Sequence, residues 1–174
     1  EEVDRAGAVR QMNADVLQLH ESITADRGLA RDFDRRAAAN LLRQRGQALA
    51  ELIRQDPAEA LKVELPGEVA GTLRRTFPEA APWVEQSGGW TGEYEAVVMD
   101  DFDAQTSQTE VRLKNGSEET MLHFAGDVEQ PSQCTQEVSV EGMRLLGEMA
   151  VRAVTGTSSA LACSTTGPQQ TLVI

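Results

Sequence analysis

The feature that most constrains the fold is a change of pattern near Trp90, where helical periodicity gives way to short runs rich in β-branched and apolar residues. The runs continue to about Val154 and are separated by turn-forming clusters, at a spacing typical of a small barrel or sandwich. Five strands are therefore expected, at Glu93–Met99, Thr109–Leu113, Thr120–Phe124, Glu137–Val140 and Met149–Val151.

Alternation and turn chemistry support these strands. Val111 and Leu113 alternate with Glu110 and Arg112, which predicts one buried and one exposed face. The segment Lys114–Ser117 contains Asn-Gly, the strongest short-range indication of a hairpin, because both residues accept a positive φ. The second and third strands are thus predicted to be antiparallel neighbours.

Everything before Trp90 has helical periodicity. In the first helix Val9, Met12, Val16 and Leu19 form an apolar stripe that Leu17 and Ile23 are expected to widen. Ser87–Gly89 is interpreted as a hinge into the β region, and Asp56-Pro57 as a restart that caps a new helix. Four helices are expected, at Glu2–Ser22, Asp34–Gln55, Ala58–Val63 and from about Pro66.

These elements predict an α+β fold, in which an N-terminal helical segment packs with a small antiparallel β-barrel of OB-like form, or with a sandwich. The helical region is placed at residues 1–87 and the β domain at 88–155. Residues 156–174 are interpreted as a linker followed by the first strand of a downstream domain. The chain ends on Leu-Val-Ile without a polar close, which favours a piece of something longer.

The net charge limits which classes of binding partner are expected. The 28 acidic residues outnumber the 16 basic ones, for a formal net charge of −12. Nucleic acid is bound mainly through clustered Lys and Arg, so a nucleic-acid partner is not expected, and an anionic membrane surface is disfavoured for the same reason. No apolar run approaches the length that spans a bilayer.

The C-terminal residues resemble a known family. Thr165–Ile174 is similar to the segment that leads into the catalytic domain of secreted bacterial metalloproteases of the gametolysin and reprolysin-like kind. Upstream, Asp56–Leu61, Leu65-Pro66, Leu122–Gly126 and Val138–Gly142 fit the outline of the N-terminal region of such proteins. The resemblance implies a pro-region that ends where the catalytic domain starts, and a secreted, extracellular or periplasmic location.

No catalytic, cofactor-binding or metal-binding residue carries over from that resemblance, because the sequence has no His-Glu-x-x-His. Asp100, Asp101 and Asp103 form the densest acidic cluster, but Thr106 stands where an EF-hand needs Gly. A looser calcium site stays open there, against a solvated turn as the simpler interpretation. His20 and His123 are interpreted as ordinary helix and strand residues, since no Gly-x-Ser-x-Gly elbow accompanies them.

Cys134 and Cys163 are the only cysteines and lie in polar, Ser/Thr/Gln-rich surroundings. Free structural thiols are usually buried among apolar neighbours, so a disulfide between the two is predicted, fastening the C-terminal linker to the barrel. The competing hypothesis is that Cys163, if it precedes a protease domain, binds the catalytic zinc as a thiolate and keeps the zymogen inactive.

Two functions follow. The first is a non-catalytic pro-domain of a secreted metalloprotease, acting as folding aid, inhibitor or spacer, with the downstream catalytic domain of the same chain as partner. The alternative is an extracellular protein- or carbohydrate-binding module that precedes another domain. The chain itself is not expected to be an enzyme, and the scarcity of aromatic residues, 4%, argues against a cleft for glycoside chemistry.

Overall fold

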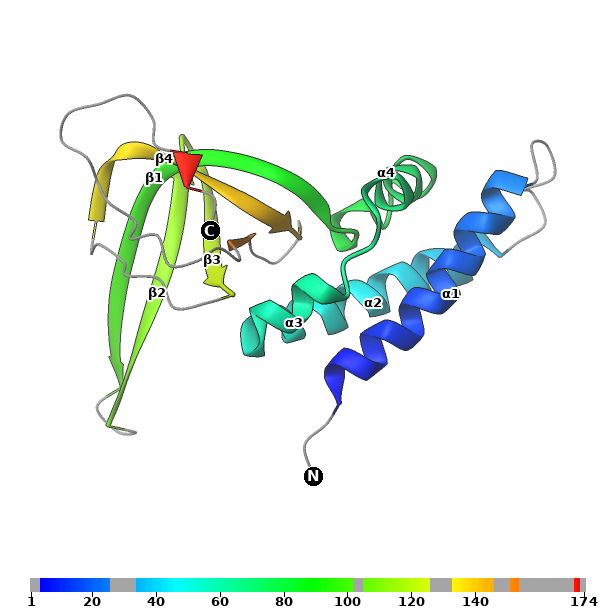
Figure 1. Ribbon diagram of the computed structural model, residues 1–174, viewed down its shortest axis with the longest axis horizontal. Helices are drawn as coiled ribbons and strands as arrows, with labels where there is room; N and C mark the ends of the chain where they lie inside the picture. The colour runs from blue at the N-terminus through cyan, green and yellow to red at the C-terminus, as the bar shows by residue number, and fades with distance from the viewer. Residues whose placement is uncertain are drawn as a thin grey trace.

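The computed structural model describes residues 4–25, 34–101, 105–125, 133–145, 151–153 and 171–172. The fold is α+β, with a helical N-terminal part packed against a curled sheet (Figure 1). No helix in the described ranges has the length and apolar character that crossing a membrane requires.

The helices follow the predicted order with small shifts of their ends. Asp34 caps α2 by accepting hydrogen bonds from the amides of Arg36 and Ala37. Asp56 caps α3 by accepting from the amide of Glu59, which confirms the predicted restart at Asp56-Pro57. The elements are α1 Arg5–Ala25, α2 Arg35–Gln55, α3 Pro57–Lys62, α4 Gly67–Thr76 and the 3₁₀ turn η1 Ala81–Trp83.

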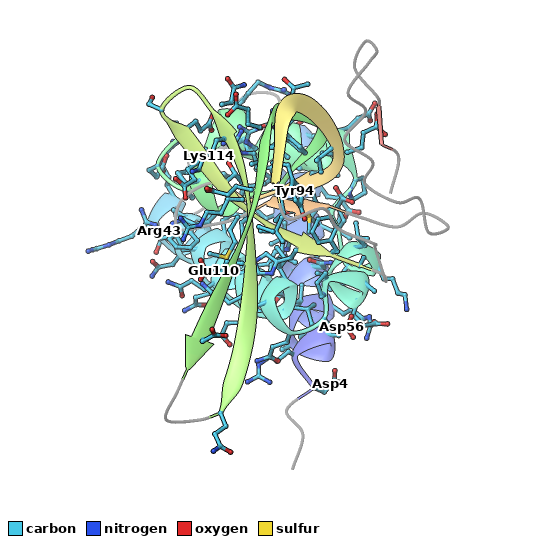
Figure 2. All side chains as sticks on the ribbon, turned by 90° about the vertical axis from the view of Figure 1, so that its left-hand side faces the viewer. Asp4, Arg43, Asp56, Tyr94, Glu110 and Lys114 are labelled. Atoms are coloured by element: carbon cyan, nitrogen blue, oxygen red, sulfur yellow. The ribbon has the colours of Figure 1, made fainter. Side chains whose placement is uncertain are left out.

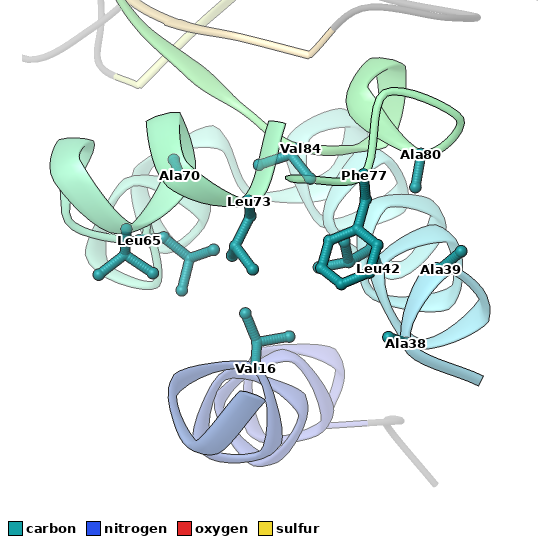
Figure 3. Close-up of a cluster of buried hydrophobic side chains, with 11 residues drawn as sticks. Val16, Ala38, Ala39, Leu42, Leu65, Ala70, Leu73, Phe77, Ala80 and Val84 are labelled. Carbon is teal, nitrogen blue, oxygen red and sulfur yellow. The ribbon is translucent and has the colours of Figure 1, made fainter. Parts of the chain in front are cut away.

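One hydrophobic cluster holds the helices together. It lies between α1, α2, α4 and the segment that precedes the sheet (Figure 3). Leu17 does not widen the stripe of α1 as predicted. Leu17 is 37% exposed, whereas its neighbour Val16 is buried in this cluster. The buried members of the cluster are Val16, Ala38, Ala39, Leu42, Leu65, Val69, Ala70, Leu73, Phe77, Ala80 and Val84.

The sheet contains the five predicted strands, several of them longer than expected. The last of the five is described at Val151–Ala153 and meets the predicted Met149–Val151 at Val151, since residues 149–150 lie outside the described ranges. A sixth, short strand lies at Thr171–Leu172, in the segment expected to hold the first strand of a downstream domain, and it pairs with β4 of this sheet. The strands are β1 Gln86–Asp101, β2 Thr106–Asn115, β3 Glu118–Phe124, β4 Gln133–Arg144, β5 Val151–Ala153 and β6 Thr171–Leu172.

The strand order makes the sheet curl. β1 is long enough to pair with β2 through its C-terminal part and with β4 through its N-terminal part. β2 pairs with β3, and β5 joins β3 to β4, parallel to the first and antiparallel to the second. These pairings run from β1 around to β1 again, in the manner of an OB-like barrel.

Two turn predictions need correction or refinement. Ser87–Gly89 is not a hinge but part of β1, where it pairs with Glu141–Met143 of β4. In the hairpin, Asn115 is still a strand residue paired with Glu118, so the two-residue loop is Gly116-Ser117. Gly116 supplies the positive φ, 59°, that this tight connection requires.

A second hydrophobic cluster joins the helices to the sheet. Met143 and Leu145, at the end of β4, are buried against α1, α2 and α3. The C-terminal end of β4 is thus packed against the helices. The cluster contains Val9, Leu49, Ala50, Leu52, Ile53, Ala60, Val63, Met143 and Leu145.

Candidate functional sites

A buried ion pair lies where the helices meet the start of the sheet. Arg45 of α2 and Glu85, the residue before β1, are each 1% exposed. The guanidinium donates to both carboxylate oxygens of Glu85, with Nη1–Oε2 2.5 Å and Nη2–Oε1 2.7 Å. This bidentate geometry is the strongest form of an Arg–carboxylate pair.

The remaining polar groups around this pair are also satisfied. Arg45 donates through Nε to Asn13 Oδ1 and through Nη2 to the carbonyl of Val63. Glu85 Oε1 also accepts from the backbone amide of Leu65, at 2.8 Å. The network therefore joins α1, α2, the segment after α3 and the start of β1. A charge pair whose hydrogen bonds are made in this way orients the elements around it, and we assign it a structural role.

Gly46 stands beside the pair for a steric reason. A Cβ at this position would lie 2.4 Å from the carbonyl oxygen of Trp83. The close approach of η1 to α2 thus depends on glycine, and the approach places Glu85 within reach of Arg45.

A polar cleft opens at one end of the barrel. It has a volume of about 200 Å³. Its outer rim includes Asn115 and Glu118, both exposed, at the hairpin between β2 and β3. Its lining residues are Gly89, Trp90, Thr91, Leu113, Asn115, Glu118, Thr120 and Arg144.

Arg144 of β4 is the charged group at the base of this cleft. Its side chain is 14% exposed and forms an ion pair with Glu118. It also donates weakly to the hydroxyl of Thr120, at 3.4 Å. Burial lowers the pKa of Arg144 from its usual value, while the adjacent carboxylate balances its charge. Asn115 Nδ2 donates to the carbonyl of Thr91, which fixes the hairpin against β1.

The outer face of β1, β2 and β3 carries a ladder of charges. Lys114 pairs with Glu95 at 2.5 Å, and Arg112 pairs with both Glu110 and Glu119 at 2.8 Å. The hydrogen bond to Glu95 raises the pKa of Lys114. Figure 2 shows Glu110 and Lys114 on the strands that face the viewer.

This ladder affects which ligands suit the face. OB-like barrels that bind oligonucleotides use the face of strands 2 and 3. Here Arg112 and Lys114 already pair with carboxylates, so a phosphate backbone would have to displace those carboxylates.

The two histidines lie on different elements, His20 on α1 and His123 on β3. His123 points from β3 toward the helices, and its Nε2 is buried without a hydrogen-bond partner. Burial, and to a smaller degree the charge of Arg54, lower the pKa of His123. His20 is a half-buried residue of α1. The described residues bring neither histidine into a nucleophile–base pair, and none of their His, Cys, Asp and Glu side chains gather in threes that would hold a metal.

The predicted disulfide, and the acidic turn at which a looser calcium site was left open, lie largely outside the described residues. Asp100 is exposed at the end of β1, Asp103 is not described, and of Asp101 only the backbone is described. The backbone of Cys134 lies in β4 opposite Tyr94 of β1, whereas Cys163 is not described. The proposed pairing of the cysteines stays a prediction.

The predictions made from the sequence did not include two of the described features, the Arg45–Glu85 ion pair and the barrel cleft. Arg45 interrupts the apolar face of α2, three residues after Leu42 and four before Leu49, and this placement is the signal that a buried partner exists. Nothing in the local sequence identifies Glu85 as that partner. No sequence pattern predicted the barrel cleft, because its residues come from four separate strands.

Comparison of the chain with protein-family models, with curated proteins and with solved structures gives no match.

Proposed function

We propose that this chain is the non-catalytic pro-domain of a secreted metalloprotease, and that it acts by holding the segment that leads into the catalytic domain. The observation that carries the proposal is the pairing of β6. Thr171–Leu172, within the segment that resembles the start of a protease domain, lies parallel to Ser139–Val140 of β4. Strand addition of this kind is a common way to bind an extended segment.

The effect of pairing β6 with β4 depends on how β4 itself is held in the molecule. One edge of β4 is occupied by β1, and β5 and β6 share the other edge. The end of β4 is anchored in the helices through Met143 and Leu145. A segment held on β4 is therefore held by the whole molecule, which suits an inhibitor or a folding template better than a passive spacer.

The first test is the reading frame beyond Ile174. The proposal requires a zinc-protease motif such as His-Glu-x-x-His within the next domain length, roughly 100–200 residues. A frame that continues into an unrelated domain, or stops, contradicts it and leaves the extracellular interaction module as the better function.

The second test uses the precursor that such a frame encodes. Leu172→Pro removes a backbone donor from β6 and disfavours strand pairing. We expect the variant precursor to lose latency and to cleave a peptide substrate faster than the wild-type precursor. Equal latency in both would show that β6 does not contribute to inhibition.

The chain 1–174 itself gives a third test. We expect no hydrolytic activity and no requirement for zinc. Peptidase activity in the purified chain that is lost on chelation would overturn the proposal.

A further inference from the structure

We propose that the cleft at the end of the barrel is a binding site for one unit of a neutral sugar. The inference is independent of the role proposed for β6, because the cleft residues lie on β1 to β4 and none belongs to the C-terminal segment. Ligands are commonly bound in the mouths of barrels, where a few polar groups converge beside an apolar surface.

The charge balance of the cleft indicates a neutral ligand. Among the described residues that line it, Arg144 is the only base and Glu118 the only acid, and the two form an ion pair. An anion would have to displace Glu118 from Arg144 and leave that carboxylate without its partner. A neutral ligand can hydrogen-bond to the outer lone pairs and N–H groups while the pair persists.

The hydrogen-bonding groups of the cleft suit hydroxyl groups. Thr91 and Thr120 offer hydroxyls, Asn115 an amide, Glu118 an acceptor and Arg144 a donor. A sugar hydroxyl both donates and accepts, so it can satisfy each of these groups. A purely apolar ligand would cover Arg144 and Thr120, both mostly buried, without offering them a hydrogen-bond partner.

An aromatic ring completes the cleft. Trp90 is half-buried on β1 and lines the cleft next to Gly89. Its indole offers a flat apolar surface, of the kind on which the C–H face of a sugar ring packs. The low aromatic content of the chain argued against such a cleft, but a single unit needs only one ring.

Size limits the ligand to a single unit. The volume of about 200 Å³ is below the range of roughly 300–1,000 Å³ that accommodates drug-sized ligands. The cleft therefore suits either a free monosaccharide or the end of a longer glycan whose other units extend past the exposed Asn115 and Glu118.

The test uses the full chain and the indole N–H signals of its tryptophans in NMR. The chain has two tryptophans, Trp90 in the cleft and Trp83 in η1, so Trp83 is an internal control. The probes are glucose, galactose, mannose and N-acetylglucosamine, each free and as a tetrasaccharide, with acetate and citrate as anionic competitors. We expect at least one sugar to shift the Trp90 signal saturably and to leave the Trp83 signal in place.

Variants locate the site. Trp90→Ala lacks the reporting indole, so its binding is measured by isothermal titration calorimetry beside the wild type; it should weaken binding about tenfold or more through lost apolar contact. Arg144→Lys should weaken binding through loss of the planar donor. Trp83→Phe and Arg112→Lys, both outside the cleft, should bind as the wild type does. An unchanged Trp83 signal and far-UV circular dichroism would verify that the Trp90 and Arg144 variants are folded.

The outcomes separate the possibilities. Tighter binding of a tetrasaccharide than of its monosaccharide would identify a glycan end as the ligand, and equal binding a free sugar. The proposal is overturned if no sugar up to about 10 mM, weaker than typical specific affinities, shifts the Trp90 signal. It is also overturned if acetate or citrate binds more tightly than every sugar, or if the control variants lose binding as well.

Discussion

Glu85→Gln is the most informative perturbation of the fold. The carboxylate accepts three buried hydrogen bonds, two from Arg45 and one from the amide of Leu65. An amide of the same shape has only one oxygen, and its NH₂ group would face a guanidinium that can only donate. The substitution therefore leaves a buried positive charge and at least one buried donor without an acceptor.

The magnitude follows from the burial of both partners. Removing one member of a buried ion pair costs about 3–5 kcal/mol, because the other charge is left uncompensated. For a chain of this length each 1 kcal/mol lowers the melting temperature by about 2–4 °C, so a decrease of about 6–20 °C is expected. Urea unfolding followed by circular dichroism measures the free energy of unfolding directly.

The double variant Arg45→Met/Glu85→Leu separates charge burial from packing. It removes both charges together, so its free energy of unfolding should lie closer to that of the wild type than the single variant does. Glu79→Gln is the matched control, since Glu79 makes a bidentate pair with Arg35 at the surface, at 2.8 and 3.0 Å. Its unfolding midpoint should not change measurably. A Glu85→Gln variant within about 1 kcal/mol of the wild type would refute the assignment of a buried, satisfied network.

Four further outcomes are expected. Leu49→Ala should cost about 2–5 kcal/mol in urea unfolding, because Leu49 is 0% exposed in the cluster that joins helices to sheet; a change within ~0.5 kcal/mol would show an exposed face. Gly46→Ala should lower the melting temperature, because its Cβ would meet a backbone carbonyl that cannot move independently of η1. The pKa of His123 is lowered by burial, so the unfolded state takes up its proton first as pH falls below about 6.5, and stability should decrease in that window; His123→Gln should flatten this part of the pH profile, and an unchanged slope would contradict the shift. Intact mass of the purified protein after alkylation without reductant should show no alkylated thiol at Cys134 or Cys163; two alkylated thiols would exclude the disulfide and favour the zinc-blocking cysteine.

Local chemistry explains which parts of the fold were predictable. The caps at Asp34 and Asp56 and the hairpin around Gly116 depend on side chains and φ preferences of neighbouring residues. The alternation of Val111 and Leu113 with Glu110 and Arg112 likewise needs only the two-residue period of a strand. These elements could be placed, within a few residues, from the sequence.

The errors occurred where distant segments decide the outcome. Ser87–Gly89 has the composition of a hinge, yet it is held in β1 because β4 supplies its hydrogen-bond partners some fifty residues later. Leu17 belongs to the apolar pattern of α1, but only the packing of α2 determines which residues of that pattern are covered.

By itself, the sequence determined the α+β class, the order of helices and strands, and the acidic character that disfavours polyanionic partners, because each depends on residue type and short-range period. The tertiary structure alone decided that Arg45 meets Glu85, and that Trp90, Asn115, Glu118 and Arg144 surround one cleft. Apart from Asn115 and Glu118, which share one hairpin, those groups are separated by tens of residues along the chain, and only the curling of the sheet and its docking onto the helices bring them within contact distance.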